Sequence, residues 1–286
     1  MLGRATVGLI SLVLVWGNLV AGLKAGLGCP DWPLCYGKVL PPYRWDTYME
    51  FLHRVIAAAA GIALCALAVR RFRSYRGAAR AVPAAAVLLL LAEAGMVGAV
   101  VLLEIPVQLT TVHFLAGLLI FLLAFYLAAF DGESSPPGFS LSGYASLFFA
   151  LGWLVFLLAA MGAYVRHSEA GLALPDWPTN LGGLVPPLLS GGVLVHFAHR
   201  LLAAVVLASV GGLVVASSLD GRLARHRGAA RGLLAMLLLQ VGVGGAVVLT
   251  GLFFLSTALH LAIALGMLAV LSRMWFREIG WNAAAP

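Results

Sequence analysis

The chain has 286 residues, of which 62% are hydrophobic and only 10% are charged. This composition excludes an ordinary soluble domain and indicates an integral membrane protein. The formal net charge of +7 does not indicate a nucleic-acid-binding protein, because the basic residues flank apolar segments and no soluble domain carries them.

Eight apolar segments are long enough to cross a bilayer as helices. We therefore expect an all-α integral membrane protein with eight transmembrane helices. The first segment follows Arg4 and could be a signal peptide, but about nineteen apolar residues exceed the usual core of such a peptide, which favours a retained helix. The expected spans are roughly residues 5–23, 49–69, 82–103, 107–129, 143–165, 192–216, 232–251 and 255–275.

Arginine residues collect in loops that would share one side of the membrane. Five follow the second span and four follow the sixth, whereas the loops on the opposite side together hold four Lys or Arg. Because positively charged loops stay in the cytoplasm, we expect both termini to lie there. The loops at residues 24–48 and 166–191 are then on the outer side.

Short segments of the first half return in the second half, which indicates an internal duplication. GLGCPDWP at 26–33 returns as GLALPDWP at 171–178, and FLHR at 51–54 returns as FAHR at 197–200. The repeated Pro-Asp-Trp-Pro is expected to form a rigid lid over a pocket in each half. Two further repeats are RGAAR at 76–80 and 227–231, and GAVVL at 98–102 and 245–249.

Each half contains four of the expected spans. Because four is an even number, the halves should insert the same way up and be related by an axis along the membrane normal. We therefore predict two tandem, pseudo-two-fold-related four-helix bundles, at residues 1–130 and 143–286. A cytoplasmic linker at 131–142 joins them.

Four of the seven histidines form two matching pairs, His53 with His113 and His199 with His260. Each lies near the outer end of a span, where histidine is costly unless it has a function. Two histidines on facing helices can be the axial ligands of a haem iron. Any one of them could instead form a helix-to-helix hydrogen bond, but the recurrence in both halves favours haem. Zinc or copper would need further Cys or carboxylate ligands, which the outer ends lack.

Glu50 lies three residues before His53 and would share its helix face. There it could move protons or stabilise a cation beside the haem, or it could simply be a carboxylate at the helix start that interacts with the helix dipole. Arg54 could neutralise a haem propionate or reach lipid headgroups.

The second half has His196 where the first half has Glu50. His196 could therefore replace His199 as a ligand, but the following Arg200 repeats the His-Arg pair of the first half and favours His199. Arg200, like Arg54, could neutralise a haem propionate or reach lipid headgroups.

Further polar and small residues occur within or beside the spans. Glu93 lies deep in the third span. It could be a proton-path residue, a buried partner of another group, or a protonated and inert side chain, and the sequence does not decide among these. His167 and His226 are expected to face solvent. Glycines in the third and seventh spans should let helices approach closely, namely Gly95, Gly98, Gly242, Gly244 and Gly245.

These features together resemble the haem A synthase family, membrane enzymes that convert haem O to haem A. The resemblance covers nearly the whole chain and includes the motif Glu-x-x-His-Arg, here Glu50 to Arg54. It implies that the first half holds the substrate haem O through His53 and His113, and the second half holds a resident haem b through His199 and His260. It also implies oxidation of the C8 methyl to a formyl group by two hydroxylations with loss of water, with Glu50 important for catalysis.

Relatives in this family carry paired cysteines in the outer loop, here Cys29 and Cys35. On the oxidising side of the membrane they could form a disulfide that staples the loop, or a redox-active pair that exchanges reducing equivalents with the haem site. The second half has Leu174 and Asn180 at the matching positions. It therefore departs from relatives with a pair in each half, and a mechanism that needs the second pair is excluded.

The resemblance also implies a multi-pass protein in the bacterial cytoplasmic (inner) membrane, surrounded by lipid. Its expected partners are haem O synthase and an unidentified electron donor, and a homo-oligomer stays open. A b-type cytochrome that only carries electrons would use the same histidines, but it would need neither Glu50 nor a single cysteine pair. Transport is disfavoured because the spans lack broken helices and a polar midplane site.

Overall fold

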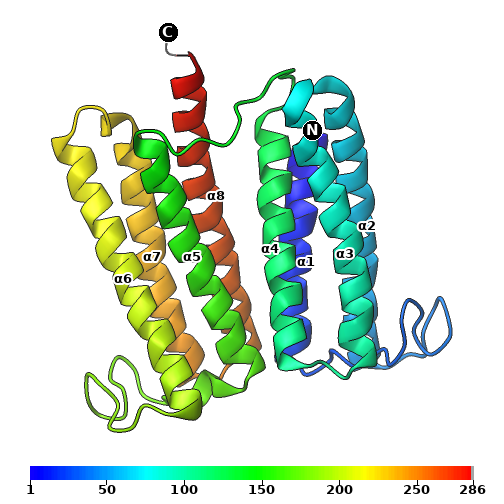
Figure 1. Cartoon of the computed structure of the whole chain (residues 1–286). Helices are drawn as coiled ribbons and strands as arrows, with labels where there is room; N and C mark the ends of the chain where they lie inside the picture. The colour runs from blue at the N-terminus through cyan, green and yellow to red at the C-terminus, as the bar shows by residue number, and fades with distance from the viewer. Residues whose placement is uncertain (285–286) are drawn as a thin grey trace. The chain divides into compact units, whose positions relative to one another are not determined.

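The computed structural model describes residues 1–284. In that part of the chain eight helices are long and apolar enough to cross a membrane, which confirms the predicted all-α, multi-pass fold. The chain separates into two compact units, Met1–Pro136 and Pro137–Pro286, seen in Figure 1 as two groups of helices. We call them unit 1 and unit 2.

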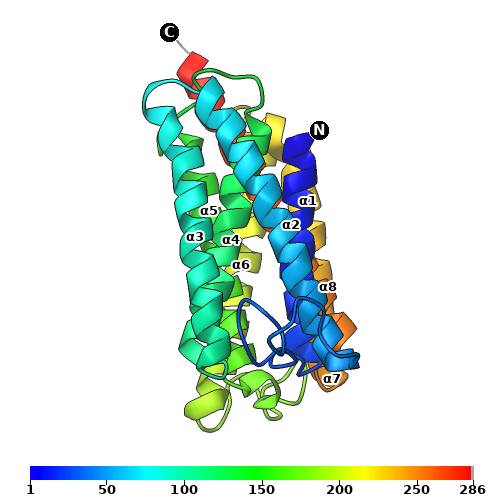
Figure 2. The ribbon, with the colours of Figure 1, turned by 90° about the vertical axis from the view of Figure 1, so that its right-hand side faces the viewer.

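Unit 1 is a ring of four helices, α1 to α4. Both α1 and α3 pack against α2 and α4, so α2 and α4 occupy diagonal positions and face each other across the bundle. The loop between α1 and α2 lies at the end of the unit opposite the N-terminus (Figures 1 and 2). The helices are α1 (Leu2–Gly22), α2 (Trp45–Ser74), α3 (Ala81–Leu102) and α4 (Val107–Ala129), with the 3₁₀ turn η1 (Gly77–Arg80) before α3.

Unit 2 has the same internal order. Both α5 and α7 pack against α6 and α8, so α6 and α8 are the diagonal pair. The loop between α5 and α6 lies at the end of this unit opposite the C-terminus (Figure 1). The helices are α5 (Tyr144–His167), α6 (Gly191–Leu219), α7 (Arg227–Leu249) and α8 (Phe254–Ala284), with the 3₁₀ turns η2 (Ala170–Leu172) and η3 (Ala224–His226).

Several helices are longer than the apolar segments that predicted them. Helix α2 begins at Trp45, four residues before the expected start, and ends at Ser74, five residues after the expected end. Helix α8 continues to Ala284. Apolar residues mark only the part of a helix that lipid surrounds, whereas backbone hydrogen bonding continues into the polar segments on either side.

At the end opposite the long loop, each unit has a buried basic side chain that is paired with a carboxylate. In unit 1 the buried Arg71 lies 2.6 Å from the carboxylate of Asp131 and donates a hydrogen bond to the backbone of Leu127. In unit 2 Nε2 of His226 lies 2.6 Å from Oε1 of Glu278, which also accepts a 2.7 Å hydrogen bond from Arg225.

The prediction that His226 faces solvent is therefore wrong. Turn η3 directs this side chain into unit 2, where it is completely buried and its ring lies 4.7 Å from that of Phe148. His167, the other histidine expected in solvent, is half-buried at the end of α5.

Candidate functional site

The histidines of unit 1 lie on its diagonal helices, His53 on α2 and His113 on α4. The His53 ring rests against α1 at Gly17, where an added Cβ would come within 2.9 Å of the ring carbon Cε1. Nδ1 of His113 lies 2.6 Å from Oε1 of Glu93 on α3. Each imidazole is therefore placed by a neighbouring helix.

The histidines of unit 2 are arranged in the same way, His199 on α6 and His260 on α8. An added Cβ at Gly162 of α5 or at Gly244 of α7 would lie 3.1 Å from Cε1 of His199 or of His260, respectively. Glycine leaves room for each ring against the next helix. Gly244 thus accommodates a histidine and not a neighbouring helix backbone.

The ring nitrogens fit the axial ligands of a haem. Nδ1 is buried without a hydrogen-bond partner in His53, His113, His199 and His260, and in His113 it has Oε1 of Glu93 beside it. Because Nδ1 points into the protein, Nε2 is the nitrogen available to a metal. No group of three or more His, Cys, Asp or Glu that could hold a bare metal ion occurs within residues 1–284.

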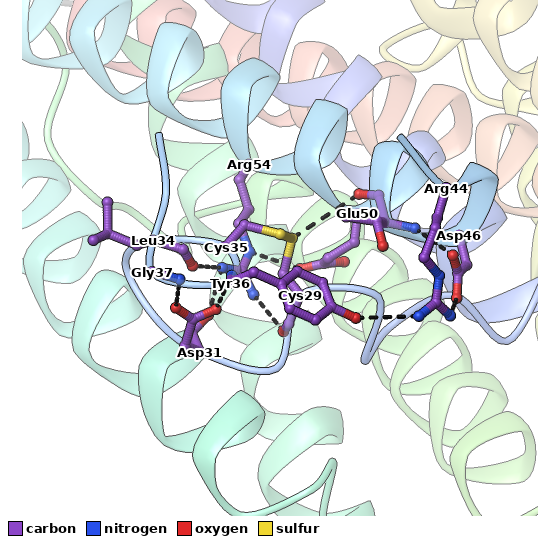
Figure 3. The surroundings of a disulfide bond; sticks show 11 residues. Cys29, Asp31, Leu34, Cys35, Tyr36, Gly37, Arg44, Asp46, Glu50 and Arg54 are labelled. Atoms are coloured by element: carbon purple, nitrogen blue, oxygen red, sulfur yellow. Dashed lines mark hydrogen bonds and ion pairs between the residues drawn. A yellow bond between two sulfur atoms is a disulfide. The ribbon is translucent and has the colours of Figure 1, made fainter. Parts of the chain in front are cut away.

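Glu50 is buried, with 5% of its surface exposed, and is paired with Arg54 (Figure 3). Nε of Arg54 donates a 3.0 Å hydrogen bond to Oε1 of Glu50. Helix α2 begins at Trp45, so Glu50 lies in its second turn, one turn further in than the interpretation as a helix-start carboxylate expects. The carboxylate therefore interacts with a side chain and not with the helix terminus.

Arg54 also connects α2 to the outer loop. Its two Nη atoms donate hydrogen bonds to the backbone carbonyls of Asp31, Leu34 and Cys29 at 2.7, 2.8 and 3.1 Å (Figure 3). The interpretation of Arg54 as a side chain that reaches lipid headgroups is therefore wrong, because its guanidinium group is turned toward the loop. Four of the five guanidinium N–H groups are used in this way.

Arg200 makes a similar set of contacts in unit 2. Its Nη1 donates to the carbonyl of Thr179 at 2.7 Å and to Oδ1 of Asn180 at 3.0 Å, and its Nη2 donates to the carbonyl of Leu174 at 2.8 Å. The lipid-headgroup interpretation is wrong here for the same reason. Nε of Arg200 donates to Nε2 of His196 at 3.3 Å, so His196 corresponds to Glu50 in position and in partner.

Each outer loop folds around an aspartate of the Pro-Asp-Trp-Pro repeat. Asp31 accepts 2.6 Å hydrogen bonds from the backbone N–H groups of Tyr36 and Gly37, and the bond from Gly37 is the main reason why its pKa is below the usual range. In unit 2 the carboxylate of Asp176 accepts hydrogen bonds from the Thr179 hydroxyl and from two backbone N–H groups. The Thr179 bond contributes most to lowering its pKa.

The turn that follows is the same in both units, although only one has a disulfide. Cys29 and Cys35 are bonded to each other and both are buried. In unit 2 the matching Leu174 and Asn180 are also buried, and the Asn180 amide donates to the carbonyl of Leu184 at 2.9 Å. The turn therefore forms without a covalent bond.

The repeated tryptophans pack against glycines. An added Cβ at Gly98 of α3 would lie 3.2 Å from the Trp32 ring, and one at Gly245 of α7 would lie 2.6 Å from the Trp177 ring. These glycines receive a loop side chain, whereas an added Cβ at Gly95 or Gly242 would meet nothing within 4 Å. The expectation that these four glycines bring helices together is therefore wrong.

Comparison with known proteins places the sequence in a family. Residues 43–272 match the family model described as cytochrome oxidase assembly protein. A heme A synthase of Symbiobacterium thermophilum is 31% identical over 285 residues, which cover 95% of this chain and 92% of that protein. The chain belongs to the haem A synthase family.

Other members of the haem A synthase family give similar matches. The heme A synthase of Exiguobacterium sp. is 30% identical over 259 residues, which cover 87% of this chain and 82% of that protein. That of Halalkalibacterium halodurans is 32% identical over 205 residues, which cover 68% of each chain. The similarity therefore extends through both units.

The contact between Glu93 and His113 fits one of the three interpretations of Glu93, that of a partner of another group, but the sequence alone did not identify His113 as that group. Its signal in the sequence is positional. Glu93 lies 20 residues before His113, and Gln240 lies 20 residues before His260. The duplication therefore has a carboxylate in one half and an amide in the other at equivalent positions.

Proposed function

We propose that this protein is a haem A synthase, which oxidises the C8 methyl of haem O to the formyl group of haem A. The observation that carries the proposal is the pair of histidines with buried Nδ1 atoms on diagonal helices of each unit, in a chain that belongs to this family. A two-haem arrangement of this kind suits one site that reacts and one site that delivers electrons.

In this proposal unit 1 binds the substrate haem O through His53 and His113, and unit 2 holds a resident haem b through His199 and His260. The asymmetry at the second turn of α2 and α6 supports this assignment, because unit 1 has Glu50 where unit 2 has His196. His199 is preferred to His196 as the ligand, since Nε2 of His196 already accepts a hydrogen bond from Arg200.

When bound, the haem iron supplies the redox chemistry. Two hydroxylations of the C8 methyl give a diol, and loss of water from the diol leaves the formyl group. We assign Glu50 the task of holding or moving a proton near the porphyrin edge, because its carboxylate is buried, lies one helical turn from His53 and is kept in place by Arg54. Arg54 and Arg200 each use four of their five guanidinium N–H groups within the protein. We assign the remaining N–H of each to a haem propionate.

The outer loops serve as lids that keep water from the two haems. Three contacts support this role in unit 1: the hydrogen bonds from Arg54 of α2 to the loop, the packing of Trp32 on α3, and the disulfide within the loop. We assign the Cys29–Cys35 disulfide the role of a structural staple, because both cysteines are buried.

The partners and the location follow from the same proposal. Haem O synthase would supply the substrate, and an electron donor in the bacterial cytoplasmic membrane would supply reducing equivalents. The arginine-rich loops support a topology with both termini in the cytoplasm.

The test is to purify the protein from cells that also make haem O and to extract and separate its haems by chromatography with mass detection. The proposal expects haem A or a hydroxylated haem O beside haem b. If haem b alone is found, and stays alone after haem O, a reductant and oxygen are supplied, the protein is instead a b-type cytochrome that only transfers electrons.

A further inference from the structure

Glu93 is a half-buried carboxylate with one short contact. Its Oε1 lies 2.6 Å from Nδ1 of His113, and its side chain is 13% exposed. The two atoms are in close contact, and no hydrogen bond of regular geometry joins them. The other oxygen, Oε2, is buried and has no hydrogen-bond partner within the described chain, so the carboxylate is directed at the histidine.

Unit 2 lacks this contact. Gln240 occupies the equivalent position on α7, and its Oε1 is buried without a hydrogen-bond partner. Nδ1 of His260 has no side-chain partner, and the group that interacts with this ring is the backbone of Gln240. The carboxylate–histidine pair therefore occurs in only one of the two duplicated sites, at the ligand proposed to hold the substrate haem.

We propose that Glu93 is a positioning residue that orients His113 and increases its electron donation to the haem iron, an inference that rests on the function proposed above. By lying against Nδ1, where it can accept the N–H, the carboxylate favours the ring orientation and the tautomer that present Nε2 to the iron. A carboxylate behind a ligating imidazole also makes that ligand more basic, which favours the oxidised state of the metal.

The consequence is a difference between two otherwise equivalent sites. The haem in unit 1 has a more electron-donating axial ligand than the haem in unit 2, so its reduction potential is lowered relative to a site with glutamine at position 93. A purely structural role, in which Glu93 only connects α3 to α4, would leave the potential unchanged on substitution.

Reciprocal substitutions separate these two roles. Glu93→Gln gives unit 1 the residue that unit 2 already has, and Gln240→Glu gives unit 2 the carboxylate. Both changes nearly preserve side-chain volume, so the fold is expected to persist. The potential of each haem is measured by optical redox titration of the purified holoprotein, and the low-spin ferric signals are followed by electron paramagnetic resonance.

Glu93→Gln is expected to raise the potential of the unit 1 haem and to weaken haem retention there by about 10-fold or more. Gln240→Glu is expected to lower the potential of the unit 2 haem. Unchanged potentials and unchanged ferric signals in both variants would overturn the proposal. If one variant fails to fold, the other decides the question in the same way.

These readouts do not depend on turnover. They report the ligand field of whichever haem occupies unit 1, so the inference about Glu93 can fail while haem A is still made. Conversely, a preparation that makes no haem A but shows both shifts would contradict the proposed function and leave the role of Glu93 supported.

Discussion

Glu50 and His196 occupy equivalent positions, and each accepts a hydrogen bond from the arginine four residues later in its helix. Two of the arginine contacts to the outer loop are also equivalent, since Leu34 matches Thr179 and Cys29 matches Leu174. A neutral histidine therefore suffices for this loop attachment in unit 2. The carboxylate in unit 1 is not needed to hold the loop, which supports a chemical role for it.

Glu50→His tests the chemical role of Glu50 more specifically than Glu50→Ala does. Alanine would leave Arg54 without its side-chain partner in a buried place. Glu50→His should bind haem normally but form haem A about 100-fold more slowly or worse, the range typical of a lost general acid or base. Haem extraction from cells that make haem O measures the product. Normal haem A formation by this variant would remove Glu50 from the catalytic machinery.

The outer loops are the elements on which the two units can be compared most directly. Each loop is held at its base by an arginine, folds around an aspartate, and inserts a tryptophan against a glycine of α3 or α7. Only the first loop has a disulfide. Three predictions concern these contacts.

Because Gly245 contacts Trp177, we expect alanine at position 245 to destabilise the protein. Gly245→Ala places a methyl group 2.6 Å from the indole ring, so Trp177 must move, and we expect destabilisation of about 1–3 kcal/mol. The loop at 168–190 should then be cut faster by protease in detergent solution. The matched control is Gly242→Ala, where the new methyl group meets nothing within 4 Å and helix propensity improves. Equal cleavage rates in the two variants would contradict the contact.

The hydrogen bonds of Asp176 predict a pH dependence of the second outer loop. Its pKa is lower in the folded protein than in the unfolded chain, chiefly because of the Thr179 hydroxyl. The stabilisation is therefore complete above the ordinary aspartate value of about 4 and is lost as the pH falls through the lower folded value. Hydrogen exchange at residues 176–183, compared with that of Asp176→Asn, should show a constant protection from pH 7 to about pH 5 and a smaller one in stronger acid. A difference that changes between pH 7 and pH 5 would contradict this assignment.

The disulfide should contribute stability and not chemistry. A double variant, Cys29→Ser with Cys35→Ser, is expected to lose about 2–3 kcal/mol, the contribution of a short closed loop, while still forming haem A at moderate temperature. Thermal unfolding and haem extraction on the same preparation measure both quantities. Loss of haem A formation in a variant that remains folded would show that the pair is redox-active.

At the scale of the whole molecule, the duplication places one histidine pair in each compact unit. The two units should therefore lose their haems independently. His199→Ala is expected to remove haem b and leave haem O bound in unit 1, whereas His53→Ala should retain haem b and lose the substrate. The haem content of each purified variant, measured after acid extraction, tests this assignment, and loss of haem b from His53→Ala would reverse it.

Much of this architecture was predictable because it depends on information that is linear in the chain. The length and apolarity of each span indicate a membrane helix, and the repeats reveal the duplication. The pairing of His53 with His113 follows from their equivalence to His199 and His260. A disulfide between Cys29 and Cys35 could also be expected, because both residues lie in one short loop.

The remaining contacts required the tertiary structure. Helices in lipid are apolar on nearly every face, so their sequences do not indicate which face meets a neighbour. For this reason the direction of Arg54, the contact of Glu93 with His113 and the burial of His226 could not be predicted from the sequence. The amino-acid sequence by itself determined the membrane class, the eight spans, the duplication and the histidine pairs. Only the packing of the helices decided which polar side chain serves each histidine, because that depends on how each helix is rotated about its axis.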